Sequence, residues 1–429
     1  MLKNFENVAA LFLSLLILLT GHGLQLTLVP LYAASLGFSP VLIGYIGSAY
    51  FLGFVLGCLL IPRLIASVGH IRVFLVLAST ATAALLLLSV LEHPLFWILL
   101  RLFTGWAMAG LYMVFESWLN TNATEDNRGL ILSVYVLLTL VAIGLGQLLI
   151  GLDLGFTDFI IWGAVLLALG AVPVGVTRSE APAPVALTGM NLGRVFRVSQ
   201  VAVLGALVAG FVTSGFWALG PLVATSQGVP LERVGIFMAL TITGGAAAQL
   251  PVGRLSDRLD RRLVILLLFV LAVLLCGAAV LLTPRLPQAI YPVMFLFGAT
   301  TFPLYSICLA HANDNTGLNL LEIGSAILLM QSVGAVLGPL VIATVIASVD
   351  AGFFMATGLV MAVFTLWLAP RIVLHRVDRP YFEPFTELPG TTQEAFELSQ
   401  PEPVEQAEAT HSTVTEKPTS PETTSAEKH

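Results

Sequence analysis

The chain has 429 residues, of which 57% are hydrophobic and only 10% are charged, with a mean hydropathy of +0.94. Soluble domains carry roughly 25% charged residues, so this composition excludes a water-soluble globular protein and predicts an all-α, polytopic membrane protein. The net charge of −6 is unevenly spread: residues 1–371 hold 15 basic and 14 acidic side chains, whereas residues 372–429 hold 4 and 11. Neither part has the basic excess of a nucleic-acid-binding protein, and no nucleic acid is expected as a partner.

Runs of about 20 apolar residues are long enough to cross a bilayer as helices. The first run, from about Val8 to Tyr32, is too long for the apolar core of a signal peptide and contains no small-residue cleavage site. We therefore interpret it as the first of twelve spans. The predicted spans are 8–32, 41–62, 72–91, 95–119, 129–151, 157–177, 200–226, 232–252, 263–283, 288–311, 321–347 and 351–371.

The basic residues orient these spans. With twelve spans and the N-terminus inside, fourteen Lys and Arg residues fall on the cytoplasmic side, and only Arg233 and Arg285 fall outside. This bias follows the positive-inside rule and predicts that both termini are cytoplasmic.

The longest internal connection, at 178–199, predicts a cytoplasmic linker between an N-terminal half at 1–177 and a C-terminal half at 200–372. Residues 373–429 are rich in Pro, Thr, Ser and Glu, which predicts a disordered acidic cytoplasmic tail.

The two halves are related in sequence. A shift of 191 positions pairs Pro30 with Pro221 and Arg63 with Arg254, and a shift of 193 positions pairs Tyr112 with Tyr305. Chance coincidence accounts for shared Gly and Leu in apolar helices more easily than for matched Pro, Arg and Tyr. Six-helix repeats joined by a linker predict a binding site near the membrane midplane, between two halves that move against each other.

The connection after the eighth span reads Gly253-Arg254-Leu255-Ser256-Asp257-Arg258-Leu259-Asp260-Arg261-Arg262. It resembles the loop signature of the major facilitator superfamily. The resemblance implies that Gly253 permits close helix approach and that Asp257 meets a helix N-terminus or an arginine. We therefore expect a cytoplasmic gate of Gly253, Arg254, Asp257, Arg258 and Arg261. A solvated basic loop would account for the arginines alone. The first half has Ala66 where the signature has an acid, so it lacks this carboxylate.

Arg101 lies about six residues inside the fourth span and resembles the arginine motif of that helix in the superfamily, with Thr104 in place of the usual Gln. A charge at such a position normally faces a partner or a water-filled cavity. The alternative is that the side chain extends to the outer interface, roughly 9 Å away.

His22 lies midway along the first span, which the superfamily fold would place on the cavity together with spans four, seven and ten. A histidine there can bind a proton or substrate, or it can remain neutral and hydrogen-bond across helices. We expect the substrate or proton site among His22, Gln25, Arg101, Tyr112, Trp217, Tyr305 and Gln331.

Glu116 ends the fourth span, roughly 22 Å from Arg101, so the two do not pair. It is expected at the inner mouth as a gate residue with Arg63, Arg72 or Arg128, or as an ordinary interfacial carboxylate. Asp314, at the inner end of span ten, is a second gate candidate.

The chain has no phosphate-binding loop, hydrolase motif or ligand spacing typical of metal sites. We therefore expect no enzyme, no cofactor and no metal.

Further motifs resemble the YcaD-type bacterial branch of the superfamily, in particular Glu116-Ser117-Trp118-Leu119-Asn120 and Ala310-His311-Ala312-Asn313-Asp314. The resemblance covers about residues 8–372 and implies the major facilitator fold, with 12 transmembrane helices in two six-helix pseudo-symmetric halves. It also implies a secondary active transporter in the bacterial inner membrane. We expect a monomer in the lipid bilayer that moves a small solute by alternating access, coupled to protons, with export favoured over import. The rival interpretation is a non-transporting membrane sensor that has kept the fold.

Overall fold

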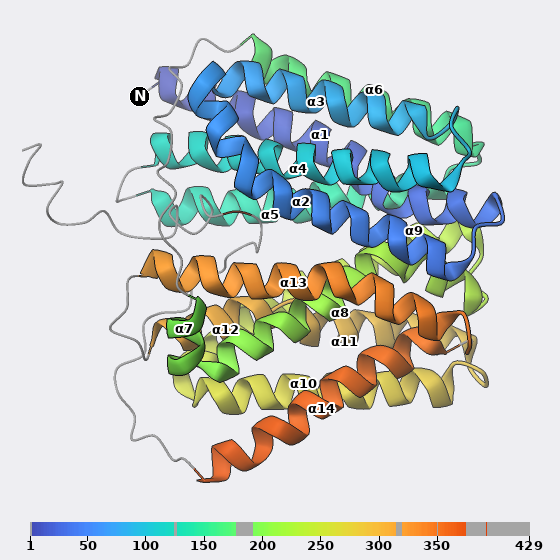
Figure 1. Cartoon of the computed structure of the whole chain (residues 1–429), viewed down its shortest axis with the longest axis vertical. Helices are drawn as coiled ribbons and strands as arrows, with labels where there is room; N and C mark the ends of the chain where they lie inside the picture. The colour runs from blue at the N-terminus through green and yellow to red at the C-terminus, as the bar shows by residue number, and fades with distance from the viewer. Residues whose placement is uncertain are drawn as a thin grey trace, which may run out of the picture.

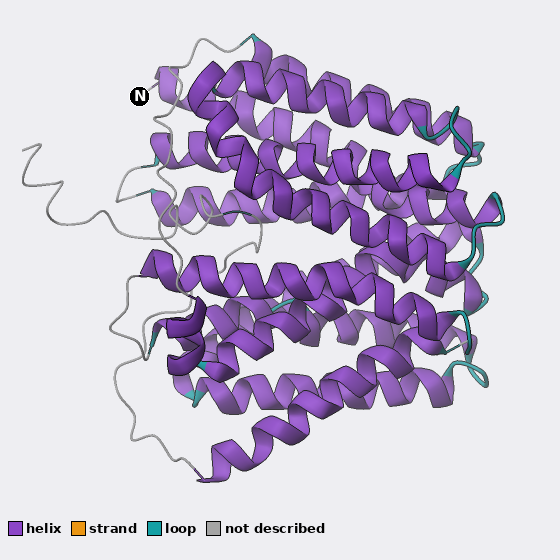
Figure 2. Cartoon of the chain, viewed as in Figure 1, coloured by secondary structure: helices purple, strands orange, loops and turns teal. Residues whose placement is uncertain are grey.

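The computed structural model describes residues 2–123, 127–176, 192–314, 320–349 and 351–374, together with Thr392. Every regular element in these residues is a helix (Figure 2). The helices run side by side in one bundle (Figure 1). They are α1 (Leu2–Ser35), α2 (Pro40–Val68), α3 (His70–Leu87), α4 (Pro94–Asn122), α5 (Arg128–Leu148), η1 (Leu149–Gly151), α6 (Phe156–Gly175), α7 (Leu192–Val198), α8 (Gln200–Ser226), α9 (Leu231–Arg258), α10 (Arg261–Leu282), η2 (Pro287–Ala289), α11 (Ile290–Thr301), α12 (Leu304–Asn313), α13 (Leu320–Ile346) and α14 (Gly352–Leu374).

Within the described residues, 12 segments are long and apolar enough to cross a membrane, which confirms the predicted number of spans. The tenth span differs from the expected continuous helix, because it breaks into α11 and α12 at Phe302 and Pro303. Proline lacks the backbone N–H that would continue the helix and clashes with the preceding turn. The predicted linker contains the short helix α7, and its residues 178–191 lie outside the described part of the chain, as does the predicted tail apart from Thr392.

The duplicated glycines make the same contact in both halves. Gly53 of α2 packs on the Leu102 carbonyl of α4, and Gly105 of α4 packs on the Tyr50 carbonyl of α2. In the second half, Gly244 of α9 and Gly298 of α11 repeat this reciprocal contact with the Phe295 and Thr241 carbonyls. In each case a Cβ would meet backbone atoms, so only glycine allows the two helices to lie so close. The sequence repeat is therefore a structural repeat.

The two halves are closed against each other at one end of the bundle. Near the start of α2, Gly44 packs on Pro339 and Ala343, close to the end of α13. One turn further along, the Ser48 hydroxyl donates to the Val336 carbonyl over 2.7 Å. These contacts lie at the end of the bundle where α1 passes into α2, which is opposite the end that carries the N-terminus (Figure 1).

At the second crossing between the halves, Gly235 of α9 packs on the carbonyl of Gln147, near the end of α5. Both crossings depend on a glycine whose Cβ would meet atoms of the opposite half. The halves are thus held together at the same end by α2 with α13 and by α5 with α9.

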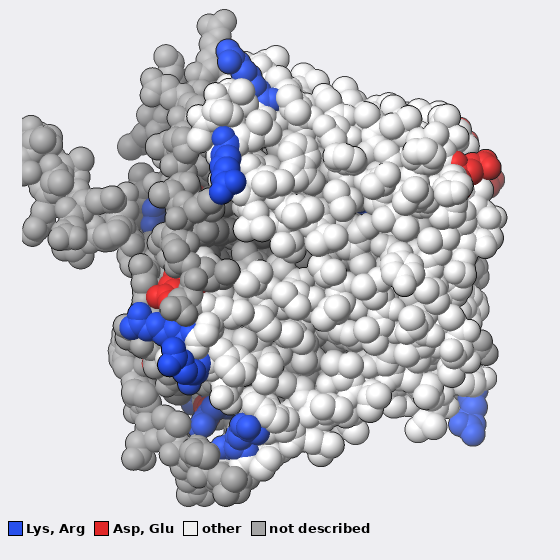
Figure 3. Space-filling view, viewed as in Figure 1, with Lys and Arg blue, Asp and Glu red and all other residues white. Residues whose placement is uncertain are grey.

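The outer surface divides by polarity. Lys and Arg gather at the end that carries the N-terminus, and the long flank of the molecule is free of charge over the face shown (Figure 3). Large apolar side chains such as Leu281, Val363 and Leu366 are exposed. An apolar belt between polar ends is what a bilayer requires of a spanning bundle.

Candidate functional site

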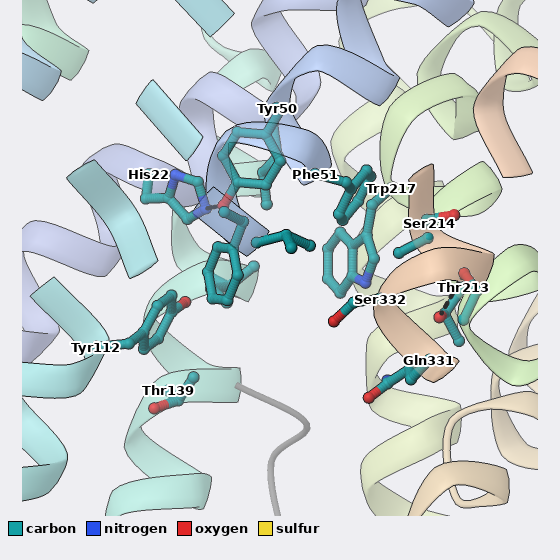
Figure 4. A pocket seen from close by; sticks show the side chains of 16 residues that line it. His22, Tyr50, Phe51, Tyr112, Thr139, Thr213, Ser214, Trp217, Gln331 and Ser332 are labelled. Atoms are coloured by element: carbon teal, nitrogen blue, oxygen red, sulfur yellow. Dashed lines mark hydrogen bonds between the residues drawn. The ribbon is translucent and has the colours of Figure 1, made fainter. Parts of the chain in front are cut away.

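A cavity of about 230 Å³ lies between the two halves. Its walls come from α1, α2, α4 and α5 of the first half and from α8 and α13 of the second half (Figure 4). The lining residues are His22, Leu26, Tyr50, Phe51, Phe54, Val55, Tyr112, Thr139, Ile143, Gly210, Thr213, Ser214, Trp217, Gln331, Ser332 and Ala335. A concave, mostly apolar cavity with a few convergent polar groups is typical of small-molecule sites.

The first-half wall centres on Tyr50. Its phenol oxygen lies 3.2 Å from Nε2 of His22, and the two rings stack with centroids 5.8 Å apart. The guanidinium carbon of Arg101 lies 4.4 Å from the centroid of the same tyrosine ring, a cation–π contact. His22 and Arg101 are 2% and 5% exposed, respectively. Three helices thus bring an imidazole, a phenol and a guanidinium into one buried cluster.

The polar groups of this cluster are incompletely satisfied. His22 Nδ1 and Arg101 Nε and Nη1 are buried without a hydrogen-bond partner. Buried polar groups in proteins are nearly always paired, so unpaired ones beside a cavity indicate groups available to a ligand.

The second-half wall carries hydroxyl and amide groups. Thr213, Ser214 and Ser332 each donate to a carbonyl of their own helix, those of Ala209, Phe211 and Leu328. These three hydroxyl groups can therefore still accept hydrogen bonds from a ligand, but their donors are already used. The Oε1 atom of Gln331 is buried without a partner. This wall offers hydrogen-bond acceptors together with the amide N–H groups of Gln331 and the indole N–H of Trp217, whereas the first-half wall is mainly aromatic.

Glu116 lies one turn beyond Tyr112 on α4 and is fully buried. Tyr135 of α5 donates to its Oε1 atom over 2.7 Å, and the hydroxyl of Thr392 donates to its Oε2 atom. The carboxylate also interacts electrostatically with Tyr112 and with Tyr305 of the second half. Glu116 is therefore an internal group between the halves, not an ordinary interfacial carboxylate.

The other first-half gate candidates are more exposed than this carboxylate. Arg63 and Arg72 are exposed, and Arg128 donates to Asn120 over 3.4 Å. The burial of Glu116 separates it from the two exposed arginines.

The signature loop of the second half is organised by Arg261. This side chain is 1% exposed and forms ion pairs with Asp257 at 3.3 Å and with Asp314 at 2.9 Å. Gly253 is buried, whereas Arg254 and Arg258 are exposed. Arg261 therefore ties the end of α9 and the start of α10 to the end of α12.

Asp260 caps α10 and accepts from the Arg262 backbone N–H at 2.9 Å and from Arg262 Nη2 at 2.7 Å. Burial alone raises the pKa of Asp260, but the hydrogen bonds and the charge of Arg262 outweigh burial and hold the pKa below its ordinary value of 3.8.

Of the residues predicted for the substrate or proton site, His22, Tyr112, Trp217 and Gln331 line the cavity. Gln25, Arg101 and Tyr305 are buried but do not line it. The expectation that span ten would contribute was wrong for this cavity, because helices α2, α5 and α13 supply the remaining wall.

The sequence reasoning missed the aromatic wall of α2, formed by Tyr50, Phe51 and Phe54. A signal was present, since three aromatic residues within five positions are unusual beside the small residues of that span. However, an apolar spanning helix does not reveal which of its faces points inward.

Comparison with known proteins agrees with this architecture. The family model described as Major Facilitator Superfamily matches residues 11–339 and 203–400. The chain is 29% identical over 343 residues to a protein of Escherichia fergusonii named "Uncharacterized MFS-type transporter YcaD", covering 78% of this chain and 88% of the relative. The protein of the same name from Salmonella arizonae is 30% identical over 336 residues, covering 77% and 87%.

Solved structures share the fold. The nucleoside transporter NupG has a TM-score of 0.69 at 14% identity, covering 87% of this chain and 99% of that chain. A bacterial homolog of the human lysosomal transporter Spinster, in an inward-facing and unoccupied conformation, has a TM-score of 0.67 at 13% identity, covering 92% and 97%. With the twelve spans, the repeated halves and the family match over most of its length, this chain belongs to the Major Facilitator Superfamily.

Proposed function

We propose that this protein is a secondary active transporter of a small solute that works by alternating access in the bacterial inner membrane. The observation that carries the proposal is the cavity walled by both halves, because a site shared between two rigid bodies changes its accessibility when they rock. The basic end of the bundle is assigned to the cytoplasm by the positive-inside rule. With this orientation the closed crossings would lie on the outer side, which supports an inward-facing state.

Proton coupling is assigned to the cluster of His22, Tyr50 and Arg101. An imidazole is the side chain whose ordinary titration falls nearest to neutral pH, and this one contacts the tyrosine hydroxyl over 3.2 Å inside the membrane-spanning region. Buried ionisable groups in spanning helices commonly form proton relays.

The direction proposed is export. The lining contains a single amide side chain, Gln331, and no carboxylate, so it lacks the dense array of polar groups that would hold a sugar. The lining instead favours an amphipathic solute with a substantial apolar face.

Alternating access is tested with single cysteines in a background that lacks Cys58, Cys276 and Cys308. Thr213→Cys and Ser332→Cys place thiols on the cavity wall. Ser35→Cys and Ser67→Cys serve as matched controls, because both serines are exposed and lie at the ends of α1 and α2, at opposite ends of the bundle. Each variant is labelled with a membrane-impermeant maleimide in right-side-out and inside-out vesicles.

The control thiols should each react from one side only, whereas the cavity thiols should react from both. Cavity thiols that react from the cytoplasmic side alone would contradict transport and favour a sensor. Proton coupling is tested separately, as solute flux in proteoliposomes with an imposed pH gradient. Flux that is indifferent to the gradient, or unchanged in His22→Gln, would contradict the coupling.

A further inference from the structure

The Arg101 charge is not balanced by a carboxylate of the described chain. The ion pairs formed within the described ranges involve Arg261 and Arg262, not Arg101. Arg101 is 5% exposed, and two of its guanidinium nitrogens have no hydrogen-bond partner among the described residues. A buried charge in a spanning helix is costly unless it is paired, and the ring face of Tyr50 supplies attraction but no counter-charge.

Tyr50 connects this charge to the cavity, since its ring both contacts Arg101 and lines the wall. The Tyr50 hydroxyl also lies 3.2 Å from Nε2 of His22, and either group can be the donor. The first-half wall therefore presents the positive potential of Arg101 through the Tyr50 ring, which favours an anion.

The opposite wall carries an unpaired hydrogen-bond acceptor. The hydroxyls of Thr213, Ser214 and Ser332 are committed as donors to their own helices, and Gln331 Oε1 is an unpaired acceptor. A ligand that pairs with Gln331 Oε1 must bring a hydrogen-bond donor. Trp217 of the same wall supplies an aromatic ring that faces the cavity (Figure 4), and Phe54 of the first-half wall adds a second ring to the lining.

The cavity, of about 230 Å³, has room for a small ligand. The aromatic lining favours a flat body, because aromatic rings pack best in offset or edge-to-face contact.

We propose that the cavity binds a small aromatic carboxylate that carries a hydrogen-bond donor at the end of the ring opposite the carboxylate. The carboxylate lies toward His22, Tyr50 and Arg101, and the donor lies toward Gln331. The identification of this ligand as the transported substrate rests on the proposed transport function, whereas the binding preference does not.

The probes form a matched series of similar size: 4-aminobenzoate, its neutral analogue 4-aminobenzamide, its cationic analogue 4-aminobenzylamine, and benzoate, which lacks the donor. Binding is measured on the purified full-length protein by equilibrium dialysis. We expect 4-aminobenzoate to bind at least about tenfold more tightly than the neutral and cationic analogues, since the Arg101 charge behind the Tyr50 ring attracts an anion and repels a cation, and tenfold corresponds to only about 1.4 kcal/mol. Benzoate should bind more weakly than 4-aminobenzoate.

Single substitutions test which residues bind the carboxylate end of the ligand and which bind the donor end. Arg101→Met should abolish the preference for the anion, and Arg101→Lys should keep it in part. Gln331→Met should lower the affinity for 4-aminobenzoate to that for benzoate. The affinity for benzoate itself should not change. Arg233→Met is the control, because Arg233 is exposed and lies outside the cavity. If Arg101→Met does not fold, the ligand preference is tested by the ligand series on the unmodified protein and on Gln331→Met.

Equal or tighter binding of the amide or the amine, or the absence of saturable 4-aminobenzoate binding at millimolar concentration, would overturn the substrate class. The same series is then followed as flux in proteoliposomes. Arg101-dependent binding without flux would leave the binding site standing and contradict the transport function. Flux of the neutral or cationic analogue but not of the anion would support transport and overturn the substrate class.

Discussion

The phenol oxygen of Tyr50 lies 3.2 Å from Nε2 of His22 and joins α2 to α1 inside the bundle. The same tyrosine ring carries the Arg101 guanidinium of α4 on its face. One side chain thus links the three helices that form most of the first-half wall, and its ring and its hydroxyl make separable contributions.

Removal of the Tyr50 hydroxyl should destabilise the protein. Tyr50→Phe keeps the ring over Arg101 but leaves Nε2 of His22 buried without a partner, at a cost of about 1–3 kcal/mol. We expect a lower midpoint of thermal unfolding in detergent. Tyr112→Phe is the control, because Tyr112 also lines the cavity and its hydroxyl forms no hydrogen bond with a described residue. An equal loss of stability in both variants would contradict a specific role for the Tyr50–His22 contact.

The closed end of the bundle should open when its glycine contact is filled. In Gly44→Leu the new side chain meets Ala343 and Pro339 of the opposite half, and overpacking of this kind costs about 1–3 kcal/mol. The equilibrium should shift away from the closed crossing, which would be measured as faster labelling of Ser332→Cys from the side of Ser35.

The control for this shift is Gly277→Leu, since a Cβ at Gly277 meets no atom within 4 Å. Labelling that increases equally in both variants would show a general loosening of the bundle. A rate unchanged in Gly44→Leu would indicate that this crossing does not limit access.

Loss of the Arg261 side chain should be far more damaging than loss of its exposed partner. Arg261→Met leaves Asp314, whose side chain is 3% exposed, without its buried cation, at a cost of about 3–5 kcal/mol. Asp257 is 32% exposed, so Asp257→Asn should change stability by less than about 1 kcal/mol. The double variant Arg261→Met/Asp314→Leu should recover part of the loss, because an apolar pair avoids the uncompensated charge. Thermal unfolding of the three variants checks this order, and equal effects of the two single variants would contradict it.

The contribution of Asp260 should depend on pH in a defined direction. Its pKa in the folded protein lies below the ordinary value of 3.8, so its carboxylate stabilises the fold above that pH, and the stabilisation is lost as the pH falls through the folded-state pKa. Asp260→Asn should therefore lower the unfolding midpoint at pH 6, and the curves of the two proteins should converge as the pH falls below the folded-state pKa of Asp260. High salt should reduce the difference. A difference that widens toward acid pH would contradict the direction of the shift.

The sequence by itself determined the class of the protein, the twelve spans, the duplication and the basic end of the bundle. These features follow from local rules, because a bilayer demands about 20 apolar residues per helix and retains basic residues on one side. The repeat could be recognised in the sequence from matched residues such as Pro30 with Pro221 and Tyr112 with Tyr305, and in the structure Gly53 and Gly244 make the same backbone contact in each half.

Only the tertiary structure decided which side chains meet. A spanning helix is apolar all round, so its sequence does not reveal which face points inward. Three findings therefore had no unambiguous signal in the sequence. They are the place of Tyr50 in the cavity wall, the Tyr135–Glu116 hydrogen bond and the Arg261–Asp314 ion pair. Each joins residues from different helices, and such contacts depend on the rotation and crossing of helices, which packing between small residues sets.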